Sequence, residues 1–526
     1  MAPLKQREST GGHAVLVSSG ILLTRLVGFV RQWIFAGVFG LSPIAAAWGA
    51  AFRIPNMLQT LFGEGVLSAS FIPVYAKLVA EDDEEEAGRV AGAVAAILAL
   101  VTAVIVLLGV LAAPLVTYVI VGGFKGETRA LTIRLVRILF PGAGVLVLSA
   151  WCLGILNSHR KFFLSYTAPV LWNLAMIATL LISRRINQES LIVALAWGSV
   201  IGSALQFGIQ LPVVLRLGRR IRVRLETHDP QVREVVRNFV PVFISRGVVQ
   251  ISAYVDVFLA SYLPEVAVAG LTNAQTLYTL PVSLFGMAVS AAELPAMSSA
   301  LGDASQVTGY LRRRLDSGLR QIAFFVVPSA MAFLALGGVI ASVLFEHGAF
   351  HRADSTYVWG IIAGSSVGLL ASTLGRLYSS TYYALRDTRT PLRFAVIRVA
   401  LTTGLGYLCA LPLPRLIGIE PRWGAAGLTA SAGVAGWVEF TLLRRTLNRR
   451  IGQTGLPASL VAKLWASAAV AAAVAWGVKS ALGGRHPVVF GALIIGTYGA
   501  VYFAAAYLLG VEECAAAVRR LMRRRG

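Results

Sequence analysis

Charged side chains are scarce in this chain of 526 residues, where Asp, Glu, Lys and Arg together make up 14%. Soluble domains carry about 25% of such residues, so the solvated surfaces of several soluble domains cannot be formed here. Hydrophobic residues reach 56%, which excludes a disordered chain, because disorder requires low hydrophobicity. The composition therefore predicts an all-α polytopic membrane protein.

Motifs of the common catalytic and metal-binding classes are absent as well. The three cysteines lie far apart without a CxxC pair, and the six histidines are scattered, which argues against a disulfide framework or a zinc site. No GxxxxGK[ST] or HExxH pattern occurs, and the one GxSxG match, at 364–368, lies inside the expected span 354–384, so neither ATP nor a hydrolytic site is expected. We expect no enzyme activity and no cofactor.

The charge that remains is strongly basic, with 47 Lys and Arg against 25 Asp and Glu. In a soluble protein this excess would suggest nucleic acid, but in a membrane protein it is typical of cytoplasmic loops. With a cytoplasmic N-terminus, 31 of the 47 fall on that side and 8 on the other. We therefore expect no nucleic-acid partner and both termini in the cytoplasm. The acidic run 81–86 is expected to be solvated, and the basic stretch 216–237 could contact anionic lipids.

Continuous apolar runs predict about fourteen transmembrane helices, since about 20 apolar residues cross the hydrocarbon core. The expected spans are residues 14–38, 44–76, 91–121, 131–156, 163–183, 190–215, 238–262, 267–299, 320–346, 354–384, 392–412, 423–443, 459–482 and 487–510.

A weak internal repeat suggests two lobes. The triplet Leu-Phe-Gly at 61–63, followed by a proline and an arginine-ended loop, recurs at 284–286. The two copies lie in the second and eighth spans, which run in the same direction, as in transporters with parallel repeats. The predicted domains are an N-lobe over 1–230 (helices 1–6), a C-lobe over 231–450 (helices 7–12), and two extra helices with a basic tail over 451–526.

Charges inside the spans are costly and mark candidate functional residues. Arg25 lies midway along the first span, and Arg53, Asn56 and Glu64 lie in the second. One interpretation is an Arg–Glu pair that locks helices together, with Arg31 snorkelling at the outer end of the first span. The surplus of arginines favours the other interpretation, a cavity for an anionic ligand, because guanidinium binds phosphate with two hydrogen bonds.

The second lobe offers fewer charges. Arg246 lies early in the seventh span and Asp256 nearer its outer end, while Gln275 and Thr276 belong to a polar stretch of the eighth. Such hydroxyl and amide groups either line a cavity or make helix–helix hydrogen bonds. The sequence leaves both interpretations open.

Three motifs resemble those of the MurJ/MviN-type lipid II flippases, within the multidrug/oligosaccharidyl-lipid/polysaccharide exporter superfamily. Residues 24–31 (Thr-Arg-Leu-Val-Gly-Phe-Val-Arg) are similar to the family's helix 1 signature. Residues 52–73, from Phe-Arg-Ile-Pro-Asn through Phe, Glu-Gly, Ser and Phe to Pro, resemble its helix 2 pattern. Residues 383–391 (Tyr-Ala-Leu-Arg-Asp-Thr-Arg-Thr-Pro) are similar to its turn between helices 10 and 11.

The resemblance implies export of lipid II, a polyprenyl-pyrophosphate-linked peptidoglycan precursor, across the bacterial inner membrane by alternating access. In the family a cationic central cavity holds the headgroup, and a groove at helices 13 and 14 takes the lipid tail. The expected partners are this lipid-linked anionic glycan and membrane lipids. By motif, substrate-binding roles are expected for Arg25, Arg31, Arg53, Asn56 and Glu64, and we add Arg246, Gln275 and Thr276 as further binding candidates.

Departures from the family pattern leave alternatives open. Gln32 stands where an aspartate is usual, and Gln59 and Thr276 stand where arginines are usual; Gln32, Gln59 and Asp256 are candidates for gating or ion coupling. Arg246 could replace the missing helix 8 arginine. The alternatives are a flippase for a related polyprenyl-linked glycan, a drug/cation antiporter of the superfamily, and a non-transporting scaffold for other cell-wall synthesis proteins.

Overall fold

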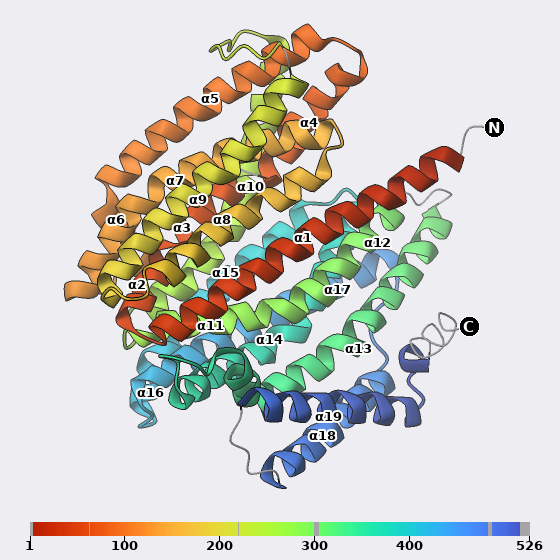
Figure 1. Ribbon diagram of the computed structural model, residues 1–526. Coiled ribbons are helices and arrows are strands. Elements are labelled where there is room, and N and C mark those ends of the chain that lie inside the picture. The colour runs from red at the N-terminus through yellow and green to blue at the C-terminus, as the bar shows by residue number, and fades with distance from the viewer. Residues whose placement is uncertain (1–3, 63, 219, 299–303, 482–486, 516–526) are drawn as a thin grey trace. The chain divides into compact units, whose positions relative to one another are not determined.

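The structure is a computed structural model that describes residues 4–62, 64–218, 220–298, 304–481 and 487–515. Within these ranges all regular elements are helices, which confirms the predicted fold class (Figure 1). They are α1 (Leu4–Phe39), α2 (Pro43–Ala51), α3 (Arg53–Phe62), α4 (Glu64–Ala80), α5 (Glu84–Leu111), α6 (Ala113–Val121), α7 (Gly126–Ser158), α8 (Phe162–Ile182), α9 (Gln188–Leu217), α10 (Pro230–Ala260), α11 (Val266–Pro281), η1 (Val282–Met287), α12 (Ala288–Ser298), α13 (Ala304–Phe345), α14 (Arg352–Ala384), α15 (Arg389–Ala410), α16 (Pro412–Leu416), η2 (Pro421–Trp423), α17 (Gly424–Ile451), α18 (Ala458–Ala481) and α19 (Pro487–Leu508).

Twelve helical segments of the described residues are long and apolar enough to cross a membrane. They correspond to twelve of the fourteen expected spans. The second expected span is divided among α2, α3 and α4, each too short to cross alone. The seventh corresponds to α10, where several side chains between 244 and 253 lie outside the described residues.

The break between α2 and α3 follows from Pro55. A proline lacks the N–H that would bond the carbonyl four residues earlier, and its ring crowds that carbonyl. Helix α2 accordingly ends at Ala51, four residues before Pro55, and Phe52 closes it with a backbone N–H to the Trp48 carbonyl at 2.8 Å. Helix α3 then starts at Arg53.

The chain folds as two compact units, Met1–Phe258 (unit 1) and Leu259–Gly526 (unit 2). In unit 1 the core helix is α7, the most buried of the candidate spans in the described residues. Its Trp151 indole donates to the Ala91 carbonyl of α5 at 3.1 Å. Its Ser149 hydroxyl donates to Gln210 at 2.7 Å and accepts from Gln206 at 2.9 Å, both on α9. Polar groups buried in a membrane need such partners, since no water is available.

In unit 2 the core helix is α14, which packs against α13 and α17. Gly368 of α14 and Gly433 of α17 lie so close that a methyl group on Gly368 would collide with the Gly433 backbone. Small residues allow this close approach, which replaces the hydrophobic effect as the source of helix association in lipid. Tyr382 adds a hydrogen bond from its hydroxyl to the Leu443 carbonyl at 3.0 Å.

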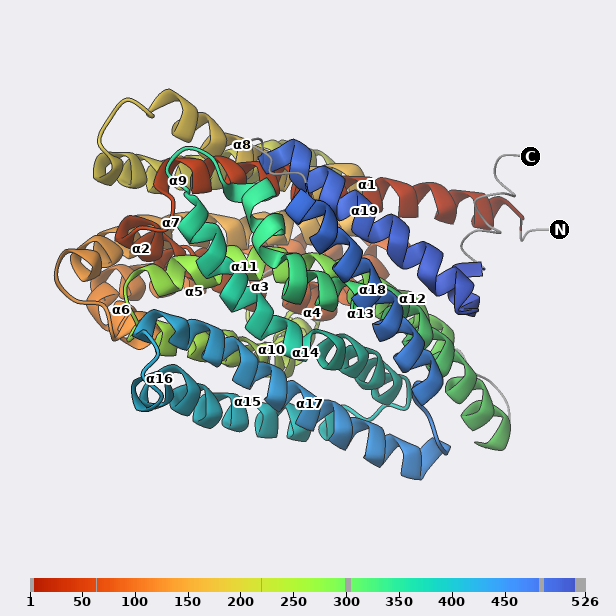
Figure 2. The ribbon, with the colours of Figure 1, turned by 90° about the horizontal axis from the view of Figure 1, so that it is seen from below.

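Helix α13 contains Pro328, which leaves the Phe324 carbonyl without its usual helical donor. The Tyr502 hydroxyl of α19 donates to this carbonyl at 2.6 Å. One turn earlier on α19, the Tyr498 hydroxyl donates to the Pro328 carbonyl at 2.7 Å. Helix α19 therefore supplies the hydrogen bond that the proline removes. Helices α18 and α19 lie side by side (Figures 1 and 2).

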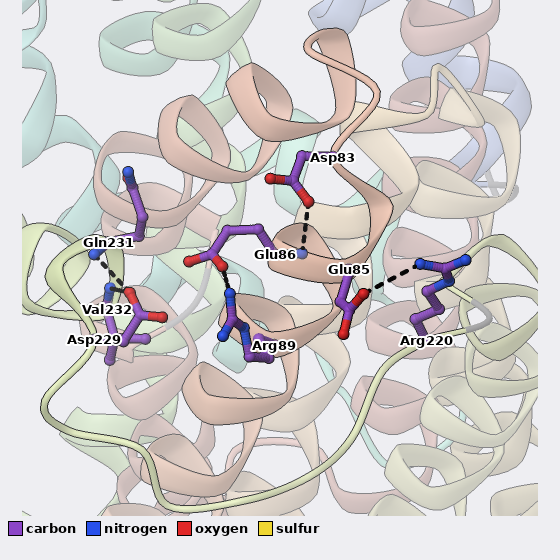
Figure 3. A network of polar contacts seen from close by, with 8 residues as sticks. All are labelled: Asp83, Glu85, Glu86, Arg89, Arg220, Asp229, Gln231 and Val232. Atoms are coloured by element: carbon purple, nitrogen blue, oxygen red, sulfur yellow. Dashed lines mark hydrogen bonds and ion pairs between the residues drawn. The ribbon is translucent and has the colours of Figure 1, made fainter.

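The basic segment between α9 and α10 lies on the first turns of α5. A methyl group on Gly88 would come within 2.7 Å of the Arg220 backbone, and one on Gly92 would collide with the Arg222 carbonyl. Arg220 pairs with Glu85 at 3.5 Å (Figure 3). Because neither glycine has a side chain, the segment can pack directly against the backbone of α5.

The acidic run 81–86 is largely solvated, as expected: residues 81–85 are exposed and Glu86 is half-buried. Asp83 caps the helix by accepting from the Glu86 N–H at 3.0 Å, and Glu86 pairs with Arg89 (Figure 3). On the facing segment, Asp229 caps α10 by accepting from the Gln231 N–H at 2.7 Å. The Glu85–Arg220 pair joins the two segments, and each cap stabilises the helix that it begins.

Candidate functional site

Arg31 of α1 is held against two aromatic rings of unit 1. Its Cζ lies 4.9 Å from the ring centroid of Phe52 and 6.0 Å from that of Trp172. The two rings are stacked with centroids 5.4 Å apart, and Nη1 lies 3.8 Å from the Met176 sulfur. A desolvated cation over aromatic faces gains about 2 kcal/mol or more. Arg31 is thus a half-buried cation with π partners.

Arg53 of α3 lies beside α10. The Tyr254 hydroxyl donates to the Arg53 carbonyl at 3.1 Å, and the charges of Arg53 and Asp256 are close enough to attract each other. Phe62, at the other end of α3, contacts the Phe243 ring at a centroid distance of 5.0 Å. The structure therefore brings together a predicted binding cation and a predicted gating acid.

The remaining predicted residues of α1 and α3 differ in exposure. Arg25 and Asn56 are exposed, whereas Gln32 and Gln59 are half-buried. Next to Arg25, the Thr24 hydroxyl donates to a carbonyl of α8 at 2.8 Å, which fixes the orientation of α1. The side chains of Glu64 and Arg246 lie outside the described residues, so their roles stay predictions.

The polar side chains of α11 bond mainly to their own helix. The Thr276 hydroxyl donates to the Thr272 carbonyl at 3.0 Å, and the Asn273 amide donates to the Ala269 carbonyl at 3.2 Å. Gln275 is exposed. A hydroxyl that bonds its own helix contributes no charge that could replace an arginine.

Arg376 of α14 was missed by the sequence reasoning. It lies within electrostatic range of Tyr278, Arg398 and Glu439. Arg398 pairs with Glu439 at 3.1 Å, and among the residues described Arg376 forms no ion pair within 4 Å. The signal was present in the sequence, since Arg376 is the sole basic residue in the expected span 354–384.

The motif at 383–391 forms a charged cap between α14 and α15. Asp387 accepts from the N–H of Thr390 at 3.0 Å and from its hydroxyl at 2.7 Å. Arg450 of α17 donates to the same carboxylate at 2.7 Å. These hydrogen bonds, led by the backbone N–H of Thr390, lower the pKa of Asp387 to about 2. The motif therefore joins three helices of unit 2.

Comparison with known proteins places the chain in a family. Residues 35–524 match the sequence profile described as lipid II flippase MurJ. The chain belongs to the lipid II flippase MurJ family. The probable lipid II flippase MurJ of Rhizobium tropici is 31% identical, covering 97% of this chain and 96% of that protein. Lipid II flippase MurJ of Burkholderia cenocepacia is 30% identical over 83% of this chain and 84% of its own length.

Solved structures agree with the MurJ family in fold. A lipid II flippase MurJ in an inward closed conformation matches with a TM-score of 0.78 and 23% identity, covering 94% of this chain and 98% of that one. An inward-facing MATE multidrug transporter of the MOP superfamily matches with a TM-score of 0.64 and 18% identity, covering 83% and 98%. The resemblance drawn from the three motifs is confirmed. MurJ proteins are transporters, which also confirms that no enzyme is involved.

Proposed function

We propose that this chain transfers lipid II from the cytoplasmic to the outer leaflet of the bacterial inner membrane. The observation that carries the proposal is the family match over residues 35–524. The retained arginines at 25, 31 and 53 support it, because a diphosphate needs cations that stay charged inside the membrane.

Each unit has its own candidate cations. In unit 1, Arg53 and Arg31 have well-defined surroundings, and Arg25 is exposed. In unit 2, Arg376 is the candidate that its electrostatic surroundings support. Arg246 belongs to unit 1 and stays a prediction from sequence alone.

The proposed topology places both termini in the cytoplasm, because the loops on that side hold most of the positive charge. Single-cysteine variants at positions 83 and 415, labelled in intact cells, test this. Labelling is expected at 415 and not at 83. The reverse pattern would contradict the orientation.

Complementation of a bacterium depleted of its own flippase tests the function. We expect the wild-type chain and Arg129→Ala, a change at an exposed arginine at the start of α7, to restore growth. Arg53→Ala is expected to fail, and Arg53→Lys is expected to restore growth in part, because lysine keeps the charge without the planar fork. Failure of the wild-type chain at normal membrane levels would favour a scaffold or another polyprenyl-linked substrate.

A further inference from the structure

Unit 2 contains a cavity at the ends of four helices, and none of the cations proposed to bind the diphosphate lines it. Its volume is about 710 Å³, within the range of about 300–1,000 Å³ typical of ligand sites. It lies where α13 ends, α14 begins, α18 ends and α19 begins. Its lining includes Glu346, Arg352, Trp359, Trp476, Lys479 and Gly491. We call it the α13–α19 pocket.

The walls of this pocket are fixed by close packing. A methyl group on Gly337 would lie 2.6 Å from the Trp359 ring, and one on Gly491 would collide with Val343. The Trp359 indole donates to the Leu334 carbonyl at 3.0 Å. The Trp476 indole donates to the neighbouring carbonyl of α13 at 2.9 Å. Two tryptophans with anchored N–H groups at helix ends are typical of the membrane–water interface.

The charges of the pocket are two cations and one anion. Arg352 and Lys479 are exposed at its mouth, and Lys479 lies 4.5 Å from the centre of the Trp476 ring. Glu346 is half-buried and accepts from the Ser355 hydroxyl at 3.4 Å. Arginine and lysine suit a phosphate, whereas a carboxylate repels one and attracts an ammonium group. A ligand that carries both groups fits all three side chains.

Exposed apolar side chains lie on the two helices that form one wall of the pocket. Val470 and Val474 of α18 and Leu493 of α19 are exposed apolar side chains, on helices that cross the membrane by length and composition. We propose that the α13–α19 pocket binds the headgroup of a zwitterionic phospholipid such as phosphatidylethanolamine. The phosphate meets Arg352 and Lys479, the ammonium meets Glu346, and the acyl chains lie along α18 and α19.

Native mass spectrometry of the purified full-length chain tests this proposal without a transport measurement. Phosphatidylethanolamine and phosphatidylglycerol with identical acyl chains are titrated separately. We expect one phosphatidylethanolamine to bind more tightly than phosphatidylglycerol. Arg352→Ala should weaken that binding about tenfold or more, because a charge-assisted hydrogen bond contributes about 1.5–3 kcal/mol. Arg352→Lys should keep most of it.

Two further variants distinguish the zwitterionic ligand from other anions. Glu346→Gln keeps the shape of the side chain and should make phosphatidylglycerol bind at least as tightly as phosphatidylethanolamine. Arg415→Ala, at an exposed arginine outside the pocket lining, is the matched control and should change neither. Equal binding of both lipids by the wild type, equal effects of Arg352→Ala and Arg415→Ala, or displacement of the lipid by inorganic phosphate would each overturn the proposal.

Discussion

Replacing Tyr502 with phenylalanine should destabilise the chain through a single backbone carbonyl. The hydroxyl is the donor for the Phe324 carbonyl at 2.6 Å, and Pro328 removes the helical donor that this carbonyl would otherwise have. Tyr502 is almost fully buried, so water cannot take the place of the hydroxyl. An orphaned buried acceptor costs about 1–3 kcal/mol, and we expect that loss in the free energy of unfolding of Tyr502→Phe.

Tyr498→Phe is the matched control on the same helix. Its hydroxyl donates to the Pro328 carbonyl at 2.7 Å, but that carbonyl keeps the N–H of Ala332 as its regular helical donor. The loss should therefore be about 0.5–1 kcal/mol, the net value of an ordinary hydrogen bond. Both values can be measured by titrating unfolding with SDS in mixed micelles and following tryptophan fluorescence.

A third change isolates the cause. Pro328→Ala restores the N–H that bonds the Phe324 carbonyl, so Tyr502→Phe should cost about 1 kcal/mol less in that background than in the wild type. The interaction energy of this double-mutant cycle does not depend on packing changes common to both backgrounds. Equal losses for the tyrosine change in both backgrounds would refute the assignment of the hydroxyl to the proline-freed carbonyl.

Three further predictions concern the Asp387 cap, the packing of Gly92 against the segment at Arg222, and Arg376 of unit 2. Asp387→Ala should lower the free energy of unfolding by about 1 kcal/mol. Because the pKa of Asp387 is lowered to about 2, this contribution is present above about pH 4 and is lost as the pH falls towards 2. In acid denaturation, Asp387→Asn should remove this part of the pH dependence. Gly92→Leu should displace the segment around Arg222 and increase its cleavage by trypsin, and unchanged cleavage would contradict the packing. Arg376→Ala should reduce lipid II transport in a flipping assay more than Arg376→Lys at equal membrane levels, whereas equal activity of both would remove Arg376 from the binding site.

The sequence was sufficient for the spans because each depends on a local run of apolar residues. The same property did not predict the division of the second span, because the overall hydropathy of residues 44–76 does not show where a helix ends, and Pro55 acts only on its own turn. Whether a proline ends a helix depends on whether a neighbouring helix supplies the hydrogen bond that the proline removes. For Pro328 a tyrosine of α19 does so and the helix continues, and no pattern in the sequence reveals that partner.

The sequence indicated which charged residues belong to the candidate site, but it did not indicate which side chains contact them. The charges inside the spans and the family motifs selected Arg31 and Arg53, but the Phe52 and Trp172 rings around Arg31 come from segments far apart in the chain. Arg376 also lies inside an expected span, but it was not selected because the motifs do not include it. Whether a polar residue lines a cavity or bonds its own helix, as Thr276 does, depends on packing that spacing does not encode.

The short helix α3 also bears on how the chain is inserted during synthesis. Its ten residues cover about 15 Å, half of the hydrocarbon thickness, and Arg53 adds about 2.5–3.5 kcal/mol against insertion. Its packing partners α7 and α10 both follow it in the chain, so neither has left the ribosome when α3 reaches the translocon. The segment can reach its final depth only after those helices arrive. Unit 1 is therefore completed late in translation, by assembly of helices already in the bilayer.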